Sequence, residues 1–278
     1  MPSRSRQRQL AKLAQRRQQE RRRQRRQRIL AIVVALVVAL GGGAFAAVAL
    51  LGGNDKPAAS ASNTPAATPT PSVSPSAPPG PVACGGKKPA AADSVAAFNG
   101  KYSKAPAMTI DPSKTYVATM QTSCGAIEIE LDAKGAPNTV NSLVFLIKQH
   151  YFDGGVFHRI VPNFVIQGGD PSGSGTGGPG YSTVDTPPAN AQYPVGTIAM
   201  AKTGSEAPGT SGSQFFVVTA DTAQQALAPG GVGQYAIVGH VTAGMDVVTK
   251  IAQVPVAGPN GDTPQEKVYI EKVTVTEK

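Results

Sequence analysis

The sequence predicts a mainly β protein: a closed eight-stranded antiparallel barrel capped by two α-helices, preceded by a transmembrane helix and a disordered linker. Beyond about residue 112, short runs of β-branched and aromatic residues are separated by Gly, Pro and Asn, which is the pattern of an all-β domain. Almost no pair of these runs is joined by a helical segment, which argues against a βαβ sheet. One long apolar run and one Pro-rich run lie ahead of them. We therefore expect one folded domain, at residues 112–278.

The first two strand-like runs, at residues 115–122 and 125–131, flank a Ser-Cys break and are expected to form a hairpin. Within the second run, IEIEL alternates apolar with charged residues, as a half-exposed strand does. Six further strands are expected at residues 157–161, 164–168, 196–201, 213–218, 235–241 and 267–275.

Two segments between the strands have helical spacing. Residues 136–152 open with Ala-Pro and place apolar residues near every third or fourth position, so we expect an amphipathic helix that covers an open end of the barrel. Residues 243–253 form a second, shorter helical pattern before the last strand. These two helices complete the predicted domain.

The positive charge of the chain is concentrated at its N-terminus. Residues 1–28 hold eleven Arg, one Lys and one Glu, a net charge of +11, whereas the whole chain is +9, so everything after residue 28 sums to −2. A basic folded domain that binds nucleic acid is therefore not predicted. The basic run is typical of a segment that sets membrane topology and touches anionic lipid; an RNA-binding arm is the alternative.

Residues 29–51 contain no charged or strongly polar side chain. At about 1.5 Å per residue they make about 34 Å of helix, enough to cross a hydrocarbon core of about 30 Å. We expect a single-pass signal-anchor in the cell membrane, with residues 1–28 cytoplasmic and the remainder outside, because positive flanks resist translocation. A cleaved signal peptide is the alternative, with cleavage after residues 44–46 or 47–49. Either way the folded domain is exported.

Residues 52–83 are dominated by Pro, Ala, Ser and Thr and contain no aromatic residue, so we expect a disordered tether.

Residues 84–111 are assigned to an N-terminal extension of the domain. The two cysteines, Cys84 and Cys124, lie on the exported side, where a disulfide is permitted. Pairing would tie the extension back onto the domain. Two free thiols are the alternative, because a sequence gives no geometry.

Two patterns in the sequence suggest a cofactor or a metal, but the residues around them do not support either site. GSGTGG, at residues 173–178, has the glycines of a dinucleotide fingerprint, but Pro179-Gly180 follows where a helix would have to begin. The three histidines have no acidic partner at motif spacing, so no catalytic triad or metal ligand set is predicted. We expect no cofactor and no metal, and we place His158 in the barrel wall.

The stretch FHRIVPNFVIQGGD, residues 157–170, brings a cation and an amide close together. Alternate residues of an extended chain share a face, so Phe157 lies beside Arg159, and Val165 beside Gln167 on the next strand. Arg159 and Gln167 can therefore converge over an apolar floor. An arginine that only reaches solvent at the barrel mouth is the alternative.

Further motifs follow in order: GTGGPGY, AMAKTGSEAPGTSGSQFFVVT and YAIVGHV. Together with FHR and P-x-F-x-x-QGGD they resemble the cyclophilin family of peptidyl-prolyl cis-trans isomerases, from about Thr115 to Val275. The apolar segment and Pro-rich tether are similar to those of exported actinobacterial members. The resemblance implies a rotamase that speeds folding of exported proteins, without cofactor or covalent intermediate. Its partners would be proline-containing peptide segments, and we expect a monomer.

The resemblance also implies roles for individual residues. Arg159 would be the catalytic residue, donating to the prolyl nitrogen as amide delocalisation breaks, and Gln167 would orient it. The residues expected to form the proline pocket are Phe164, Val165, Phe216 and Leu227. The other residues expected along the groove are Ala201, Lys202, Gln214 and Tyr235. The backbone at the first two of these would hold the peptide as an added strand.

Several positions depart from the family pattern. Val165 stands where many members have Met, Lys202 where Asn follows the clamp alanine, and Tyr235 where His is common. The segment at residues 220–234 is longer and Gly-rich, and the chain has no Trp, whereas cyclosporin-sensitive members place a Trp near there. We therefore expect weak inhibition by cyclosporin.

Two other classes of function fit the same sequence. One is a chaperone or peptide-binding module that holds Pro-containing segments without turnover, and the other is a scaffold of the cell envelope. Replacing Arg159 by Ala separates them from an isomerase, because holding should survive the loss of the cation and catalysis should not.

Overall fold

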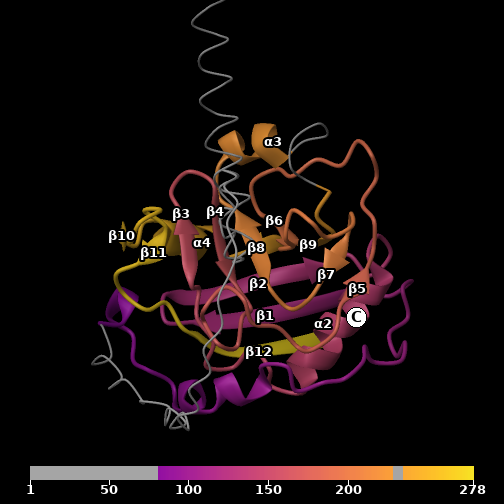
Figure 1. Cartoon of the computed structure of the whole chain (residues 1–278), viewed down its shortest axis with the longest axis horizontal. Coiled ribbons are helices and arrows are strands. Elements are labelled where there is room, and N and C mark those ends of the chain that lie inside the picture. Colours follow the sequence, from indigo (N-terminus) through magenta and orange to yellow (C-terminus); the bar gives the residue numbers. More distant parts are fainter. Residues whose placement is uncertain (1–80, 228–233) are drawn as a thin grey trace, which may run out of the picture.

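The computed structural model describes residues 81–227 and 234–278. Its centre is an eight-stranded antiparallel sheet with the strand order β12-β1-β2-β9-β6-β8-β4-β3 (Figure 1). The strands of this sheet are β1 (Tyr116–Thr122), β2 (Gly125–Leu131), β3 (Arg159–Val161), β4 (Val165–Gly168), β6 (Thr197–Met200), β8 (Phe215–Val218), β9 (Ile237–Ala243) and β12 (Ile270–Glu277). Each overlaps one of the eight runs expected from the sequence, so the mainly β fold is confirmed.

The sheet curls but does not close, so the prediction of a closed barrel is wrong. The edge strands β3 and β12 do not pair with each other. The outer edge of β3 is already occupied, because the backbone N–H of Ile160 donates to the carbonyl of Asp262 at 2.9 Å. The segments that precede the two edge strands meet instead, at a bridge between Val156 and Tyr269.

Two small sheets lie beside the main one. In the first, β5 (Thr183–Val184) pairs with β7 (Thr210–Ser211), and in the second, β10 (Val256–Ala257) pairs with β11 (Thr263–Pro264). Neither is predicted, because a two-residue strand shows no alternation. The β10–β11 hairpin lies next to β3 (Figure 1), and its connecting loop carries Asp262.

The described residues contain three α-helices: α2 (Pro137–Lys148), α3 (Asp221–Leu227) and α4 (Met245–Ala252). The first and last are the two expected helices, each shorter than its pattern. α2 ends before His150, which adopts a positive φ of 58° that a helix cannot continue through. α3 lies in the Gly-rich segment at residues 220–234, where the prediction of only two helices is wrong, because a helix of seven residues is too short for a clear periodic signal.

Buried apolar side chains form two clusters. The larger one fills the space between the sheet and helices α2 and α4, and includes Leu146, Ile160 and Ile251. The smaller one lies where α3 meets β4, β6 and β8 (Figure 1). Its members are Val165, Tyr193, Ala199, Phe216, Val218, Ala223, Leu227 and Tyr235.

The N-terminal extension runs along the outside of the domain, in purple below β12 (Figure 1). It contains the 3-10 helices η1 (Ala83–Gly85), η2 (Ala90–Asp93) and η3 (Val95–Phe98). Phe98 packs edge-on against Tyr151, with ring centroids 5.5 Å apart, and Tyr102 packs against Phe145 at 5.2 Å. These aromatic contacts fix the extension to the end of α2 and the loop that follows it.

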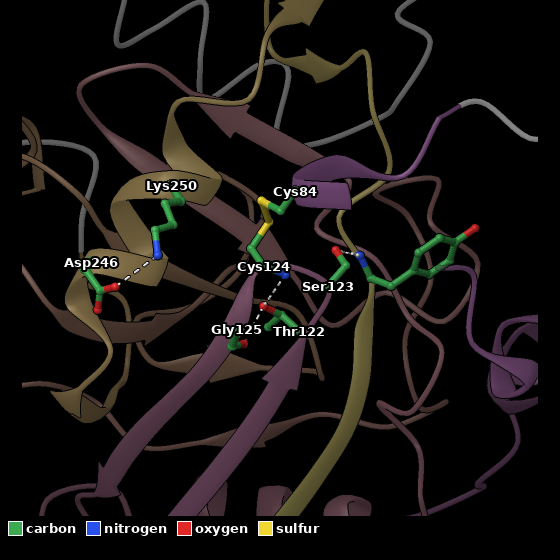
Figure 2. The surroundings of a disulfide bond; sticks show 8 residues. Cys84, Thr122, Ser123, Cys124, Gly125, Asp246 and Lys250 are labelled. Carbon is green, nitrogen blue, oxygen red and sulfur yellow. Dashed lines mark hydrogen bonds and ion pairs between the residues drawn. A yellow bond between two sulfur atoms is a disulfide. The ribbon is translucent and has the colours of Figure 1, made fainter. Parts of the chain in front are cut away.

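A disulfide joins Cys84 of the extension to Cys124 in the turn between β1 and β2, with Cα atoms 5.1 Å apart (Figure 2). Thr122 holds the same turn: its hydroxyl donates to the carbonyl of Gly125 at 2.7 Å and accepts from the N–H of Cys124 at 3.1 Å. The pairing that the sequence left open is therefore present in the structure.

The predicted cytoplasmic segment, residues 1–28, and membrane anchor, residues 29–51, lie outside the described residues, as does nearly all of the tether. Among residues 81–227 and 234–278, no helix combines the length and apolar character needed to cross a bilayer.

Candidate functional site

Arg159 and Gln167 are cross-strand partners in the β3–β4 hairpin. Asn163 adopts a positive φ of 57° between the two strands, a conformation that Asn tolerates better than most residues. The Nη1 atom of Arg159 donates to Oε1 of Gln167 at 3.2 Å. The structure thus brings together the cation and the amide that the period-two spacing predicted.

Arg159 has a second partner, Asp262, which the sequence analysis missed. Nε of Arg159 donates to Oδ2 of Asp262 at 2.8 Å, and the two side chains are only 11% and 12% exposed. Asp262 follows Asn260-Gly261, so in the sequence it looks like an ordinary turn residue. It is also 103 positions from Arg159, which leaves no local signal of the pairing.

Two of the guanidinium nitrogens of Arg159 are therefore engaged. The third, Nη2, is buried and has no hydrogen-bond partner within residues 81–227 and 234–278. A buried donor without a partner lowers stability and calls for an explanation. A ligand acceptor that reached Nη2 would satisfy a donor that the described residues leave unpaired.

Gln214 supports Gln167 from the other side. Nε2 of Gln167 donates to Oε1 of Gln214 at 3.0 Å. Nε2 of Gln214 then donates to the carbonyl oxygens of Gly175 at 3.0 Å and Gly177 at 2.9 Å. Each glutamine amide therefore donates through its nitrogen and accepts through its oxygen, which fixes its orientation.

Asp170 organises the loop that Gln214 contacts. Its Oδ2 atom accepts from the backbone N–H of Gly175 at 2.6 Å and of Gly177 at 3.0 Å. Burial acts to raise the pKa of Asp170, but hydrogen bonds from Ser172, Gly177 and Gly175 outweigh it, and the pKa lies below its ordinary value. Because these N–H groups already serve Asp170, the GSGTGG loop does not present them to a phosphate.

The four residues predicted for the proline pocket meet the predicted groove residue Tyr235 in the smaller buried cluster. We call this set the apolar wall: Phe164, Val165, Phe216, Leu227 and Tyr235. The rings of Phe216 and Tyr235 meet edge to face, with centroids 5.3 Å apart. Leu227 comes from α3 and is buried in the same cluster. The structure therefore brings all five residues together beside the strand that carries Gln167.

Tyr193 packs into the same cluster and was missed by the sequence analysis. Its hydroxyl donates to the carbonyl of Tyr235 at 2.9 Å and accepts from the N–H of Tyr235 at 3.1 Å. Burial raises the pKa of both phenols, so both stay neutral at physiological pH. A single Tyr in the loop sequence NAQYP carries no periodic signal that could have identified it.

The two predicted clamp residues, Ala201 and Lys202, directly follow β6. The N–H of Ala201 donates to the carbonyl of Gln214 at 2.8 Å. The ammonium of Lys202 lies 5.5 Å from the ring centroid of Tyr235 and donates to the carbonyl of Glu206 at 3.2 Å. Both residues thus border the apolar wall, and their role in holding a peptide stays a prediction.

His158 directly precedes Arg159 in the chain. Both of its ring nitrogens are buried and have no hydrogen-bond partner in the described part of the chain. Burial lowers the pKa of His158 below its ordinary value of 6.5, with Asp170 opposing the shift and Arg159 adding to it. His158 is therefore neutral at pH 7. Among the described residues, no group of three or more His, Cys, Asp or Glu side chains is placed to hold a metal ion.

Comparison with known proteins gives a family for this geometry. The model of the family "Cyclophilin type peptidyl-prolyl cis-trans isomerase/CLD" matches residues 117–275. Peptidyl-prolyl cis-trans isomerase B of Streptomyces anulatus is 41% identical over 177 residues, which cover 57% of this chain and 95% of the relative. Peptidyl-prolyl cis-trans isomerase A of Mycobacterium tuberculosis is 35% identical over 188 residues, covering 61% of this chain and 97% of the relative.

A similar solved structure is the cyclophilin-type peptidyl-prolyl cis-trans isomerase of Cryptosporidium parvum, crystallised in the presence of the dipeptide Ala-Pro. It is 26% identical to this chain, with a TM-score of 0.51, and the alignment covers 58% of this chain and 99% of that one. The family match spans more than half of the chain and contains the whole apolar wall with Arg159 and Gln167. The chain therefore belongs to the cyclophilin family and is a peptidyl-prolyl cis-trans isomerase.

Proposed function

We propose that Arg159 is the catalytic residue of this isomerase and that Gln167 orients it. The observation that carries this assignment is that the guanidinium of Arg159 is held at two nitrogens, Nε by Asp262 and Nη1 by Gln167, while Nη2 has no hydrogen-bond partner within the described residues. A donor fixed in this way can act on a substrate without first reorganising.

The chemistry of Xaa-Pro rotation suits such a donor. Rotation faces a barrier of about 18–20 kcal/mol, because the nitrogen lone pair is delocalised into the carbonyl group. When the bond twists, the lone pair returns to the prolyl nitrogen, and a guanidinium N–H can then donate to it. This hydrogen bond is stronger in the twisted state than in either planar state, which is the condition for catalysis. No covalent bond is made or broken, so the reaction needs no nucleophile.

The substrate class follows from the apolar wall. Its aromatic and aliphatic side chains suit the pyrrolidine ring of proline, and the solved relative was crystallised in the presence of Ala-Pro. Backbone contacts at Ala201 and Lys202 would hold the neighbouring peptide without reading its side chains. We therefore expect broad tolerance of the residues that flank proline.

The test is cis-trans exchange of a short Ala-Pro peptide, measured by magnetisation-exchange NMR with the full-length protein in detergent. Arg159→Ala should lower the catalysed rate by about 10²–10³-fold, the usual loss of a key transition-state donor. Thermal unfolding of the variant checks that the fold is kept. A folded wild type that fails to accelerate exchange would favour a holding or scaffold module instead.

We further propose that the enzyme works outside the cytoplasm, tethered to the membrane by residues 29–51. The support is the uncharged apolar composition of these residues and the net charge of +11 ahead of them. Protease added to intact cells should degrade the isomerase domain only after the cell wall is opened, and the domain should sediment with membranes. Recovery of the intact full-length chain in the soluble cytoplasmic fraction would contradict this placement.

A further inference from the structure

The ion pair between Arg159 and Asp262 is the least exposed of those in the described part of the chain. Its side chains are 11% and 12% exposed, whereas Lys250 and Asp246, for example, are 57% and 72% exposed. Bringing two charges out of water costs free energy that their attraction offsets only with good geometry. A pair kept under these conditions suggests a use beyond stability.

Asp262 is itself held in place by the backbone. Its carbonyl accepts from the N–H of Ile160 at 2.9 Å, while its carboxylate accepts from Nε of Arg159 at 2.8 Å. Asp262 therefore bonds to two neighbouring residues of β3, to Ile160 through its main chain and to Arg159 through its side chain. This arrangement fixes the carboxylate relative to the strand that carries the arginine.

A free arginine side chain has many rotamers, and its guanidinium group can present any of five N–H donors. Asp262 occupies Nε and Gln167 occupies Nη1, on two different nitrogens of the planar group. Two such contacts define both the position and the plane of the guanidinium. They leave three N–H donors uncommitted, the second one on Nη1 and both on Nη2, and Nη2 has no partner among the described residues.

We propose that Asp262 is a positioning residue for the isomerisation: its carboxylate fixes the position and plane of the guanidinium of Arg159, whose uncommitted N–H groups donate to the substrate. This inference rests on the proposed catalytic role of Arg159. Asp262 need not touch the peptide. Its removal should therefore slow the rotation step more than it weakens peptide binding, because Arg159 would keep its charge but lose its fixed orientation.

The test compares Asp262→Ala and Asp262→Asn with the wild type, all full-length, by magnetisation-exchange NMR of the Ala-Pro peptide. The rate at saturating peptide should fall about tenfold in Asp262→Ala, the scale of a lost charge-assisted hydrogen bond. The peptide dissociation constant should change by less than about threefold, because Asp262 is not expected to contact the peptide in its ground state. Asp262→Asn should lose less, because its amide oxygen can still accept from Nε.

A spectroscopic readout separates positioning from general damage. The side-chain Nε–H of Arg159 should give a resolved, slowly exchanging NMR signal in the wild type, because it donates to a buried carboxylate. The signal should shift in Asp262→Asn and lose its protection in Asp262→Ala. An Arg159→Lys sample identifies the signal by its disappearance.

Asp153→Ala is the matched control. Asp153 is 13% exposed, pairs with His150 and accepts from the N–H of Val273 at 2.9 Å, so its loss also removes a largely buried structural carboxylate. It should lower the unfolding temperature without changing the rate at saturating peptide. Equal rate losses in the two Ala variants, or a folded Asp262→Ala within about twofold of the wild type, would overturn the proposal. If Arg159→Ala itself kept full activity, the proposed function would fail first, and the two failures are thus distinguishable.

Discussion

The side-chain amide of Gln167 donates to the side-chain oxygen of Gln214 at 3.0 Å. Because Gln167 also accepts from Arg159, and Gln214 also donates to the carbonyls of Gly175 and Gly177, one continuous chain of hydrogen bonds joins Arg159 to the loop that holds these two glycines. Each member has a defined donor and acceptor end. The orientation of Arg159 therefore depends on residues that it does not touch.

Replacing Gln214 by Ala should lower catalysis moderately. Without the Oε1 atom of Gln214, the amide of Gln167 can flip and present its NH₂ group, rather than its oxygen, toward Arg159. We expect a three- to tenfold lower rate at saturating peptide, the scale of one or two neutral hydrogen bonds. Gln121→Ala, at an exposed position of β1, is the control and should have no effect. A Gln214→Ala rate equal to that of the control would show that this chain of hydrogen bonds does not control the orientation of Arg159.

Arg159→Lys should be nearly as inactive as Arg159→Ala, although it keeps the charge. An ammonium group lacks the planar fork that reaches Asp262, Gln167 and the substrate at once. Once paired with Asp262 it would have no fixed donor left for the prolyl nitrogen. The catalysed exchange rate should fall by about 10²-fold, while the unfolding temperature changes little. Retention of more than a tenth of the activity would mean that charge, and not geometry, is what the reaction requires.

Cyclosporin should inhibit this enzyme weakly. The chain contains no Trp, so it has no indole N–H, and Leu227 of the Gly-rich segment has no polar side-chain donor in its place. Inhibition constants measured in the Ala-Pro exchange assay, beside a cyclosporin-sensitive cyclophilin, test this. A low-micromolar or tighter constant would contradict the prediction.

His158 should make the protein less stable in mild acid. Its folded pKa lies below the ordinary value of 6.5, first through burial and then through Arg159, against the opposing charges of Asp170 and Asp262. The unfolded chain therefore takes up a proton before the folded one does. The stability that neutral His158 contributes is present above pH 6.5 and is lost as pH falls through the folded pKa.

Urea unfolding at about pH 7.5 and about pH 5.5 measures this effect. His158→Gln, which cannot titrate, should show a smaller drop in unfolding free energy between the two conditions than the wild type. His240→Gln serves as the control, because His240 is exposed. Equal drops in the wild type and His158→Gln would mean that other groups set the acid sensitivity.

The sequence was most informative where the physics is local. Short β-branched and aromatic runs bounded by Gly, Pro and Asn located all eight strands of the main sheet, and the spacing of Arg159 and Gln167 on adjacent strands predicted their meeting. The open edge of the sheet was not predictable, because the backbone N–H of Ile160 in β3 donates to the carbonyl of Asp262, which comes from a loop far away in the sequence. α3 was missed because it is short and lies in a Gly-rich segment.

The residues of the candidate site also divide into those that local sequence patterns predicted and those that they missed. Phe216 and Gln214, which were expected in the groove from the family pattern, lie beside Gln167, and their roles in binding stay predictions. Asp262 and Tyr193 come from irregular loops, where one residue among many turn-formers gives no periodic or charge-pattern signal. Their roles follow only from long-range contacts, which no short stretch of sequence records.

The disulfide between Cys84 and Cys124 should contribute mainly to stability. It closes a loop of 40 residues, so breaking it should lower the free energy of unfolding by about 2–4 kcal/mol through the entropy of the unfolded chain. The double variant Cys84→Ser/Cys124→Ser should unfold at lower urea than the wild type. The wild type in excess dithiothreitol should match the variant, because both lack the same constraint. If reduction left the urea midpoint unchanged, the aromatic contacts of Phe98 and Tyr102 would be sufficient to hold the extension, and the bond would be redundant for stability.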